Sequence, residues 1–156
     1  MCYLDTLDGA TVAFINYGAG TCIGLDNGKS ADDSKIFGFF YHNGPNQWWE
    51  LGKEAGSVWP TYKLHNVQSG TCADIHSGTA NGTPLSAWHN SGNDSQRWRL
   101  VTADASGLVF MIQNVATSTY VDLSNGSNAN GTLISGWAGE IQINNPNQLW
   151  QILRIN

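Results

Sequence analysis

Gln148-Leu149-Trp150, close to the C-terminus, is the last of three copies of the tripeptide that decides the fold. The same Gln-x-Trp pattern occurs earlier as Gln47-Trp48-Trp49 and Gln96-Arg97-Trp98, so the final tryptophans lie 49 and then 52 residues apart. Regular recurrence of one motif along a chain of 156 residues indicates an internal repeat, which determines how every other feature is interpreted.

Two further markers precede each copy in the same order. An asparagine ends an apolar run in Phe14-Ile15-Asn16, Leu64-His65-Asn66 and Ile112-Gln113-Asn114. A strand-like segment follows in Thr21-Cys22-Ile23-Gly24-Leu25, Thr71-Cys72-Ala73-Asp74-Ile75 and Thr119-Tyr120-Val121-Asp122-Leu123. Three markers with one order and nearly one period predict three repeats, at residues 12–51, 61–101 and 109–153 of a single domain that covers residues 1–156.

Each repeat has the pattern of short strands joined by tight turns. Apolar residues alternate with period two, as in Val121-Asp122-Leu123. Turn dipeptides separate the runs: Asn27-Gly28, Ser77-Gly78, Asn81-Gly82, Asn125-Gly126 and Asn130-Gly131. We expect about four strands per repeat and no amphipathic helix of useful length. Repeats of this size must close around a common core, which predicts an all-β protein with the β-trefoil fold and pseudo-threefold symmetry; propellers usually need four or more blades.

Charge and composition exclude several classes of function. Only 12% of the residues are charged and the net charge is −5, so the chain lacks the basic surface that nucleic acids require. No apolar run is long enough to cross a bilayer, which predicts no membrane insertion. The N-terminal residues carry acids where a signal peptide carries bases, so we expect a cytoplasmic protein, released if at all by a non-classical route. The spacing of Cys2, Cys22 and Cys72 predicts free thiols.

The triple motif, together with Gly136-Trp137 and the run from Asn145 to Trp150, resembles the ricin-B-type β-trefoil lectins, and the mushroom agglutinins among them. The resemblance covers residues 12–156 and implies a carbohydrate-binding protein with no catalytic activity, cofactor or metal. It further implies that the motif residues are structural, with the indoles in the core: Gln47, Trp49, Gln96, Trp98, Gln148 and Trp150. The sugar contacts then fall on an aspartate, an aromatic residue about fifteen positions later, and the polar residue before the glutamine.

The chemistry of such a trio suits a pyranose. A carboxylate accepts two hydroxyl hydrogens in charge-assisted bonds, and an amide both donates and accepts. A flat aromatic ring covers the continuous C–H face that the axial 4-hydroxyl of galactose leaves open. We therefore expect recognition of galactosyl or N-acetylgalactosaminyl glycans on glycoproteins or glycolipids.

The three repeats match this trio unequally. The third is complete, with Asp122, Trp137 and Asn147. The second has Asp74 and Trp88, but Ser95 replaces the asparagine. The first has Phe39 and Asn46, but Gly24 replaces the aspartate, so we expect ordinary sugar binding to be lost there; Asp26 lies two residues further along.

Strand alternation predicts that Asp122 points to solvent, on the face opposite to Val121 and Leu123. The segment 139–144 is an insertion specific to the third repeat; it either extends the site beside Trp137 or forms a plain surface loop.

An enzyme is disfavoured, because the four histidines are scattered without ligand-like spacing and no H-E-x-x-H or G-x-S-x-G motif occurs. A trefoil that has lost sugar binding and serves as an interaction subunit or protease inhibitor is the alternative function. The sequence leaves a homodimer open.

Overall fold

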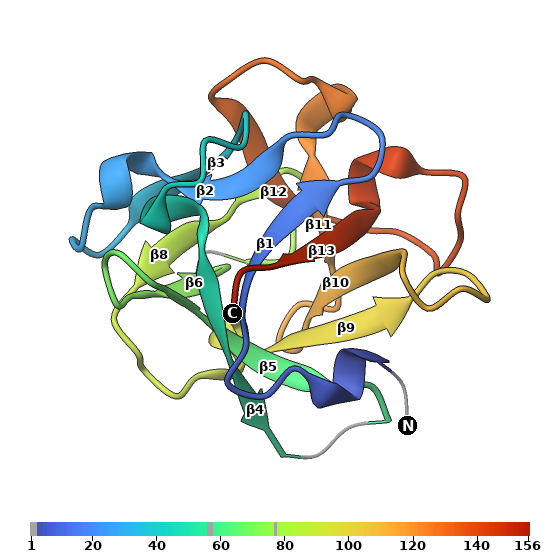
Figure 1. Cartoon of the computed structure of the whole chain (residues 1–156), viewed down its shortest axis with the longest axis horizontal. Coiled ribbons are helices and arrows are strands. Elements are labelled where there is room, and N and C mark those ends of the chain that lie inside the picture. Colours follow the sequence, from blue (N-terminus) through green and yellow to red (C-terminus); the bar gives the residue numbers. More distant parts are fainter. Residues whose placement is uncertain (1–2, 56–57, 77) are drawn as a thin grey trace.

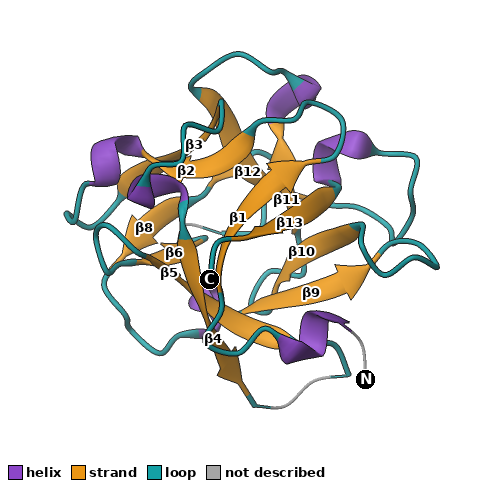
Figure 2. Cartoon of the chain, in the orientation of Figure 1, coloured by secondary structure: helices purple, strands orange, loops and turns teal. Residues whose placement is uncertain are grey.

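The computed structural model describes residues 3–55, 58–76 and 78–156. Within them lie thirteen strands joined by loops and short 3₁₀ turns (Figures 1 and 2). The strands are β1 (Thr11–Asn16), β2 (Cys22–Leu25), β3 (Ser34–Phe39), β4 (Trp49–Glu54), β5 (Thr61–Asn66), β6 (Cys72–Asp74), β7 (Thr83–Pro84), β8 (Ser86–Trp88), β9 (Trp98–Thr102), β10 (Phe110–Asn114), β11 (Tyr120–Leu123), β12 (Thr132–Trp137) and β13 (Trp150–Arg154). The 3₁₀ turns are η1 (Tyr3–Thr6), η2 (Asp26–Gly28), η3 (Pro45–Gln47), η4 (Asp94–Gln96), η5 (Ser124–Gly126) and η6 (Pro146–Gln148).

The first and last strands of the three repeats close a barrel. Antiparallel pairing runs from β1 to β4, β5, β9, β10 and β13, and β13 pairs again with β1. The ring therefore closes and leaves no open edge. The middle strands form hairpins, β2–β3, β6–β8 and β11–β12, and neighbouring hairpins pair through β3–β8, β3–β12 and β7–β12. This is a β-trefoil, as predicted.

One repeat departs from the expected four strands. In the second unit the third strand is divided into β7 and β8, and Pro84 ends β7. Proline has no backbone N–H to give to a ladder, so pairing is interrupted where it stands. The turns at Asn27-Gly28 and Asn125-Gly126 have the positive φ angles expected of them, whereas Ser77 lies outside the described residues.

The motif tryptophans lie at the centre of the core. Trp49, Trp98 and Trp150 are at most 1% exposed. Each indole Nε1–H donates to a strand carbonyl at 3.0 Å, and the acceptors are Ile23, Ala73 and Val121. Each acceptor belongs to the residue immediately before the aspartate position of the same unit. The buried indole therefore also fixes the strand that carries this position. A buried indole needs such an acceptor.

The marker asparagines join each unit to the one before it. Asn66 lies opposite Trp49, Asn114 opposite Trp98, and Asn16 opposite Trp150. The Nδ2 atoms of Asn66 and Asn114 donate to the carbonyls of Asn46 and Ser95, and that of Asn16 donates to the loop around Asn147. Their Oδ1 atoms accept backbone N–H groups of the following turn, as in Asn16 with Gly18 and Ala19. Every unit boundary is therefore closed by the same buried amide.

The cysteines within the described residues are buried free thiols. Burial raises the pKa of Cys22 to about 12 and that of Cys72 to about 11. Cys2 lies outside the described residues. In the described ranges, no helix has the length and apolar character that a bilayer span requires.

Replacing a core tryptophan should destabilise the fold far more than replacing a surface one. We expect Trp150→Ala to lower the free energy of unfolding by about 3–5 kcal/mol, because it leaves a large cavity and an unpaired Val121 carbonyl. Trp137→Ala, at a 43% exposed indole, is the matched control. Urea unfolding followed by circular dichroism measures the free energy of unfolding of both variants. Equal losses in this free energy would contradict the assignment of Trp150 to the core and Trp137 to the surface.

Candidate functional site

Strand register brings the predicted positions of each unit onto one face of its hairpin. Trp137 lies opposite Tyr120, two residues from Asp122 along β11. Residues directly opposed in a pair of strands project to the same side, as do residues two apart in one strand, so Trp137 and Asp122 share a face. The same relation places Trp88 with Asp74 in the second unit and Phe39 with Gly24 in the first.

The third-unit carboxylate is held by the motif glutamine. Gln148 Nε2 donates to Asp122 Oδ2 at 3.1 Å and to the Ala138 carbonyl at 3.1 Å. The prediction that Asp122 points to solvent was wrong: the residue is only 6% exposed, because the η6 turn that carries Gln148 packs over it. Burial raises the pKa of this carboxyl and the bond from Gln148 opposes the rise.

The other members of the third-unit trio lie on the neighbouring strand and turn. Trp137 ends β12 with its ring 43% exposed beside Gly82 of the second unit. The backbone after it is anchored by Asn81, whose Oδ1 accepts the Ala138 N–H at 2.8 Å. Asn147 precedes Gln148 and lies against the η5 turn, where a Cβ on Gly126 would come within 2.7 Å of its Oδ1. The indole that shares a strand face with Asp122 is therefore open to solvent, and Asn147 directly precedes the glutamine that binds the Asp122 carboxylate.

The inserted segment of the third unit changes how its glutamine is held. In the first two units the glutamine Oε1 accepts a backbone N–H, from His42 to Gln47 and from Ser91 to Gln96, both at 3.0 Å. In the third unit Gln148 Oε1 is buried without a protein partner. The loop carries Ile141 and Ile143, which are about half exposed, and its first residue, Gly139, lies so close to Gln148 that a Cβ there would clash with Oε1.

The second unit holds the same carboxylate in a more closed setting. Gln96 Nε2 donates to Asp74 Oδ2 at 2.9 Å, while Asp74 Oδ1 is buried without a protein partner. The imidazole of His76 stacks on Trp88, with ring centroids 4.1 Å apart and planes inclined by 19°. Ser95 is half-buried, and its carbonyl accepts from Asn114 of the next unit. One face of the Trp88 indole is thus covered by an imidazole, which strand patterns do not reveal.

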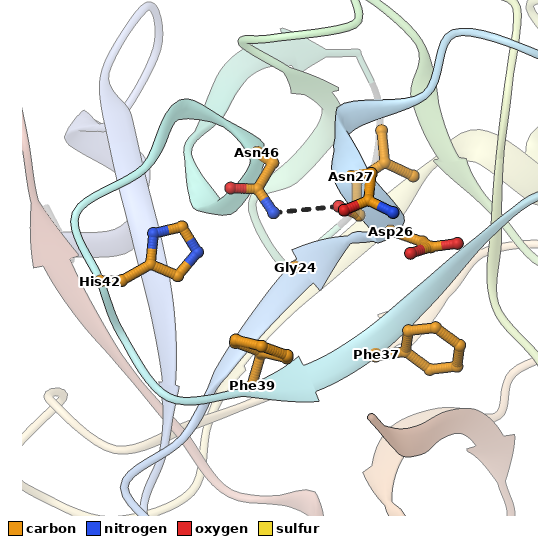
Figure 3. A pocket seen from close by; sticks show the side chains of 8 residues that line it. Gly24, Asp26, Asn27, Phe37, Phe39, His42 and Asn46 are labelled. Carbon is orange, nitrogen blue, oxygen red and sulfur yellow. Dashed lines mark hydrogen bonds between the residues drawn. The ribbon is translucent and has the colours of Figure 1, made fainter. Parts of the chain in front are cut away.

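The first unit has an open pocket where its carboxylate would be. Its volume is about 130 Å³, and the lining residues are Gly24, Leu25, Asp26, Asn27, Phe37, Phe39, His42 and Asn46 (Figure 3). Asn46 Nδ2 donates to the Leu25 carbonyl at 3.0 Å. Asp26 does reach this pocket, but its carboxylate pairs with Lys29 at 3.2 Å.

Clusters of metal-ligating side chains are absent from the part of the chain that the structure describes. Across residues 3–55, 58–76 and 78–156, no three His, Cys, Asp or Glu side chains gather closely enough to hold an ion. The groups present are hydrogen-bonding and aromatic groups, suited to a neutral polyhydroxylated ligand.

The burial of Asp122 should make stability depend on pH. Its raised native pKa means that the folded chain binds more protons than the unfolded chain as the pH rises above about 4, so the free energy of unfolding falls over this range. In Asp122→Asn this loss is absent, and we expect the variant to gain stability relative to the parent as the pH rises above about 4. Denaturant unfolding at several pH values measures it, with exposed Glu50→Gln as control; a parallel pH dependence in Asp122→Asn and the parent would contradict the assignment.

Comparison with known proteins shows which family has this architecture. Three matches to the family model described as ricin-type beta-trefoil lectin domain-like span residues 3–88, 45–137 and 94–156. No curated protein sequence matches. Among solved structures, a designed threefold-symmetric protein, ThreeFoil, is 24% identical with a TM-score of 0.82, covering 92% of this chain and 97% of its own.

Two similar structures are fungal lectins. The Rhizoctonia solani agglutinin is 25% identical, with a TM-score of 0.80 over 96% of this chain and 97% of its own. The Macrolepiota procera ricin B-like lectin, solved in complex with lactose, is 28% identical, with a TM-score of 0.76 over 94% and 96%. With its three Gln-x-Trp units closed into a β-trefoil, this chain belongs to the ricin-type β-trefoil lectin family.

Proposed function

We propose that this protein is a non-catalytic lectin for galactosyl and N-acetylgalactosaminyl glycans, with its main site in the third unit. The observation that carries the proposal is the arrangement of Asp122, Trp137 and Asn147. There, a carboxylate oriented by Gln148 lies on the same strand face as an exposed indole.

The polar and aromatic groups of this arrangement match the hydroxyl groups and the apolar face of a hexose. Asp122 accepts hydroxyl hydrogens, and the bond from Gln148 leaves its second oxygen for the ligand. Trp137 offers a flat face to the apolar side of galactose, and Asn147 serves a neighbouring hydroxyl. The lactose complex of the Macrolepiota procera lectin is consistent with a galactose-type ligand.

Several weak sites in one chain favour binding to clustered glycans. A single shallow site of this kind gives dissociation constants in the millimolar to micromolar range, about −4 to −8 kcal/mol. The second unit repeats the carboxylate and glutamine of the third, so one chain offers two candidate sites. Simultaneous occupancy raises the effective affinity for a surface that displays many copies of the ligand.

The first experiment is a glycan array with the unmodified protein and Asp122→Asn. We expect binding to terminal galactose or N-acetylgalactosamine that falls by about tenfold or more in the variant, because each charge-assisted bond contributes roughly 1.5–3 kcal/mol. Asp104→Asn, at an exposed loop carboxylate, is the control and should bind normally. Absence of binding to every glycan would contradict the proposal and favour a trefoil adapted to a protein partner.

The second-unit site should strengthen when its aromatic face is uncovered. His76→Ala removes the imidazole stacked on Trp88, so the indole becomes available to a sugar. In an Asp122→Asn background, which silences the third unit, we expect His76→Ala to tighten galactoside binding severalfold in isothermal titration calorimetry. Trp88→Ala in the same background should abolish the gain; a gain that persists would show that the effect arises elsewhere.

A further inference from the structure

A cavity of about 330 Å³, which we call the axial cavity, lies where the hairpins of the three units pair with one another. Its lining residues are Asp33, Lys35, Ile36 and Phe37 of the first unit, Pro84, Leu85 and Ser86 of the second, and Leu133 of the third. No residue of the three candidate sugar-binding trios, all of which the structure describes, lines it. Its volume lies in the range of about 300–1,000 Å³ that small-molecule sites occupy. The axial cavity is therefore a separate candidate site.

The base and walls of the axial cavity are mainly apolar. Ile36 and Leu85 are at most 3% exposed and form its base. The residues before them, Lys35 and Pro84, project to the opposite, outer face of the hairpins, because side chains alternate along a strand. Leu133 holds the same strand position in the third unit and is 38% exposed. An apolar group that enters the cavity therefore removes proline and leucine surface from water, which favours binding.

The first unit alone places charges at the mouth of this cavity. Lys35 stands at the strand position that proline and leucine occupy in the other two units. Asp33, two residues earlier, has a φ of 67°, and the equivalent residues Gly82 and Gly131 have φ angles of 86° and 84°. A positive φ disfavours residues that carry a side chain, although aspartate tolerates it better than most. The first unit therefore holds a carboxylate where the other units have the glycine that this turn favours.

Neither charge has a partner within the part of the chain that the structure describes. In the adjoining hollow, the carboxylates of Asp26 and Asp32 are already paired with a lysine at 3.2 Å and a histidine at 2.9 Å. Asp33 and Lys35 line the axial cavity and form no ion pair, either with each other or with another described residue. One carboxylate and one ammonium group therefore remain available to a ligand.

We propose that the axial cavity binds a free α-amino acid with a large apolar side chain. The ammonium group of the ligand pairs with Asp33, its carboxylate pairs with Lys35, and its side chain lies between Pro84 and Leu133. This ligand differs in chemical class from the neutral glycans of the three units, and its binding does not depend on the proposed lectin function.

A ligand with both charges suits this mouth better than a ligand with one. An anion that pairs with Lys35 is repelled by Asp33, and a cation that pairs with Asp33 is repelled by Lys35. An α-amino acid presents both charges on adjacent groups and can satisfy both residues at once. Its apolar side chain then fills the part of the cavity that no charged residue lines.

The test compares three compounds that share a phenyl ring and differ in charge: L-phenylalanine, phenethylamine and hydrocinnamate. Backbone amide resonances of the whole chain are followed by NMR during each titration. We expect L-phenylalanine to shift the amides of Leu85 and Leu133, with a dissociation constant at least about threefold lower than that of either other compound, which is the gain from one exposed ion pair. No shift at these amides, or equal affinity for either singly charged compound, would overturn the inference.

Three variants assign the contacts. In Lys35→Met we expect L-phenylalanine to bind no better than phenethylamine, and in Asp33→Gly no better than hydrocinnamate, because each change removes one charge. Leu133→Asp places a carboxylate in the apolar wall and should abolish the shifts, whereas Leu153→Asp, at a 42% exposed leucine outside the cavity, should retain them. Shifts that persist in Leu133→Asp would overturn the inference. If that variant does not fold, an unchanged preference for L-phenylalanine in both charge variants would overturn it.

Discussion

The hydrogen bond from each motif indole to a strand carbonyl is the interaction on which the rest of this structure depends. Trp49, Trp98 and Trp150 fill the core, and their Nε1–H groups fix Ile23, Ala73 and Val121 at 3.0 Å. The residue after each carbonyl is the site position, and the glutamine two residues before each tryptophan lies beside it. Packing of the core and geometry of the binding face are therefore set by one tripeptide, which explains how three diverged units keep the same frame.

The same frame keeps a polar group where an apolar one would be more stable. Asp74 and Asp122 are nearly buried, and each is tied by a glutamine amide that is itself buried. Burying a carboxylate costs free energy that one amide bond offsets only in part, as the raised pKa of Asp122 indicates. Such a group is oriented before any ligand arrives, so binding does not have to order it.

The fold followed from the sequence because three markers recur at one period, and each marker has one structural task. The spacing also placed the aspartate and aromatic positions of each unit on one strand face, as the register shows, but it did not predict their surroundings. Alternation along Val121-Asp122-Leu123 assigns one face of the strand to the core and the other to solvent. It cannot show that a 3₁₀ turn 26 residues later covers the outer face. The stacking of His76 on Trp88 and the pocket at Gly24 depend on contacts between side chains that no spacing rule encodes. Pro84 could have signalled the divided strand, since proline interrupts a ladder wherever it falls.

The boundaries between units are alike whether or not the chain is continuous there. Asn66 and Asn114 bridge units that are joined by a connector, and Asn16 makes the equivalent bridge across the two ends of the chain, where β1 pairs with β13. The connectors therefore hold the units close together but do not determine the contacts between them. A single fifty-residue segment that assembled as three separate copies would meet itself through the same contacts, and such a trimer is a physically sufficient ancestor for this protein. In one continuous chain each unit can differ from the others, as Gly24 and the segment 139–144 illustrate.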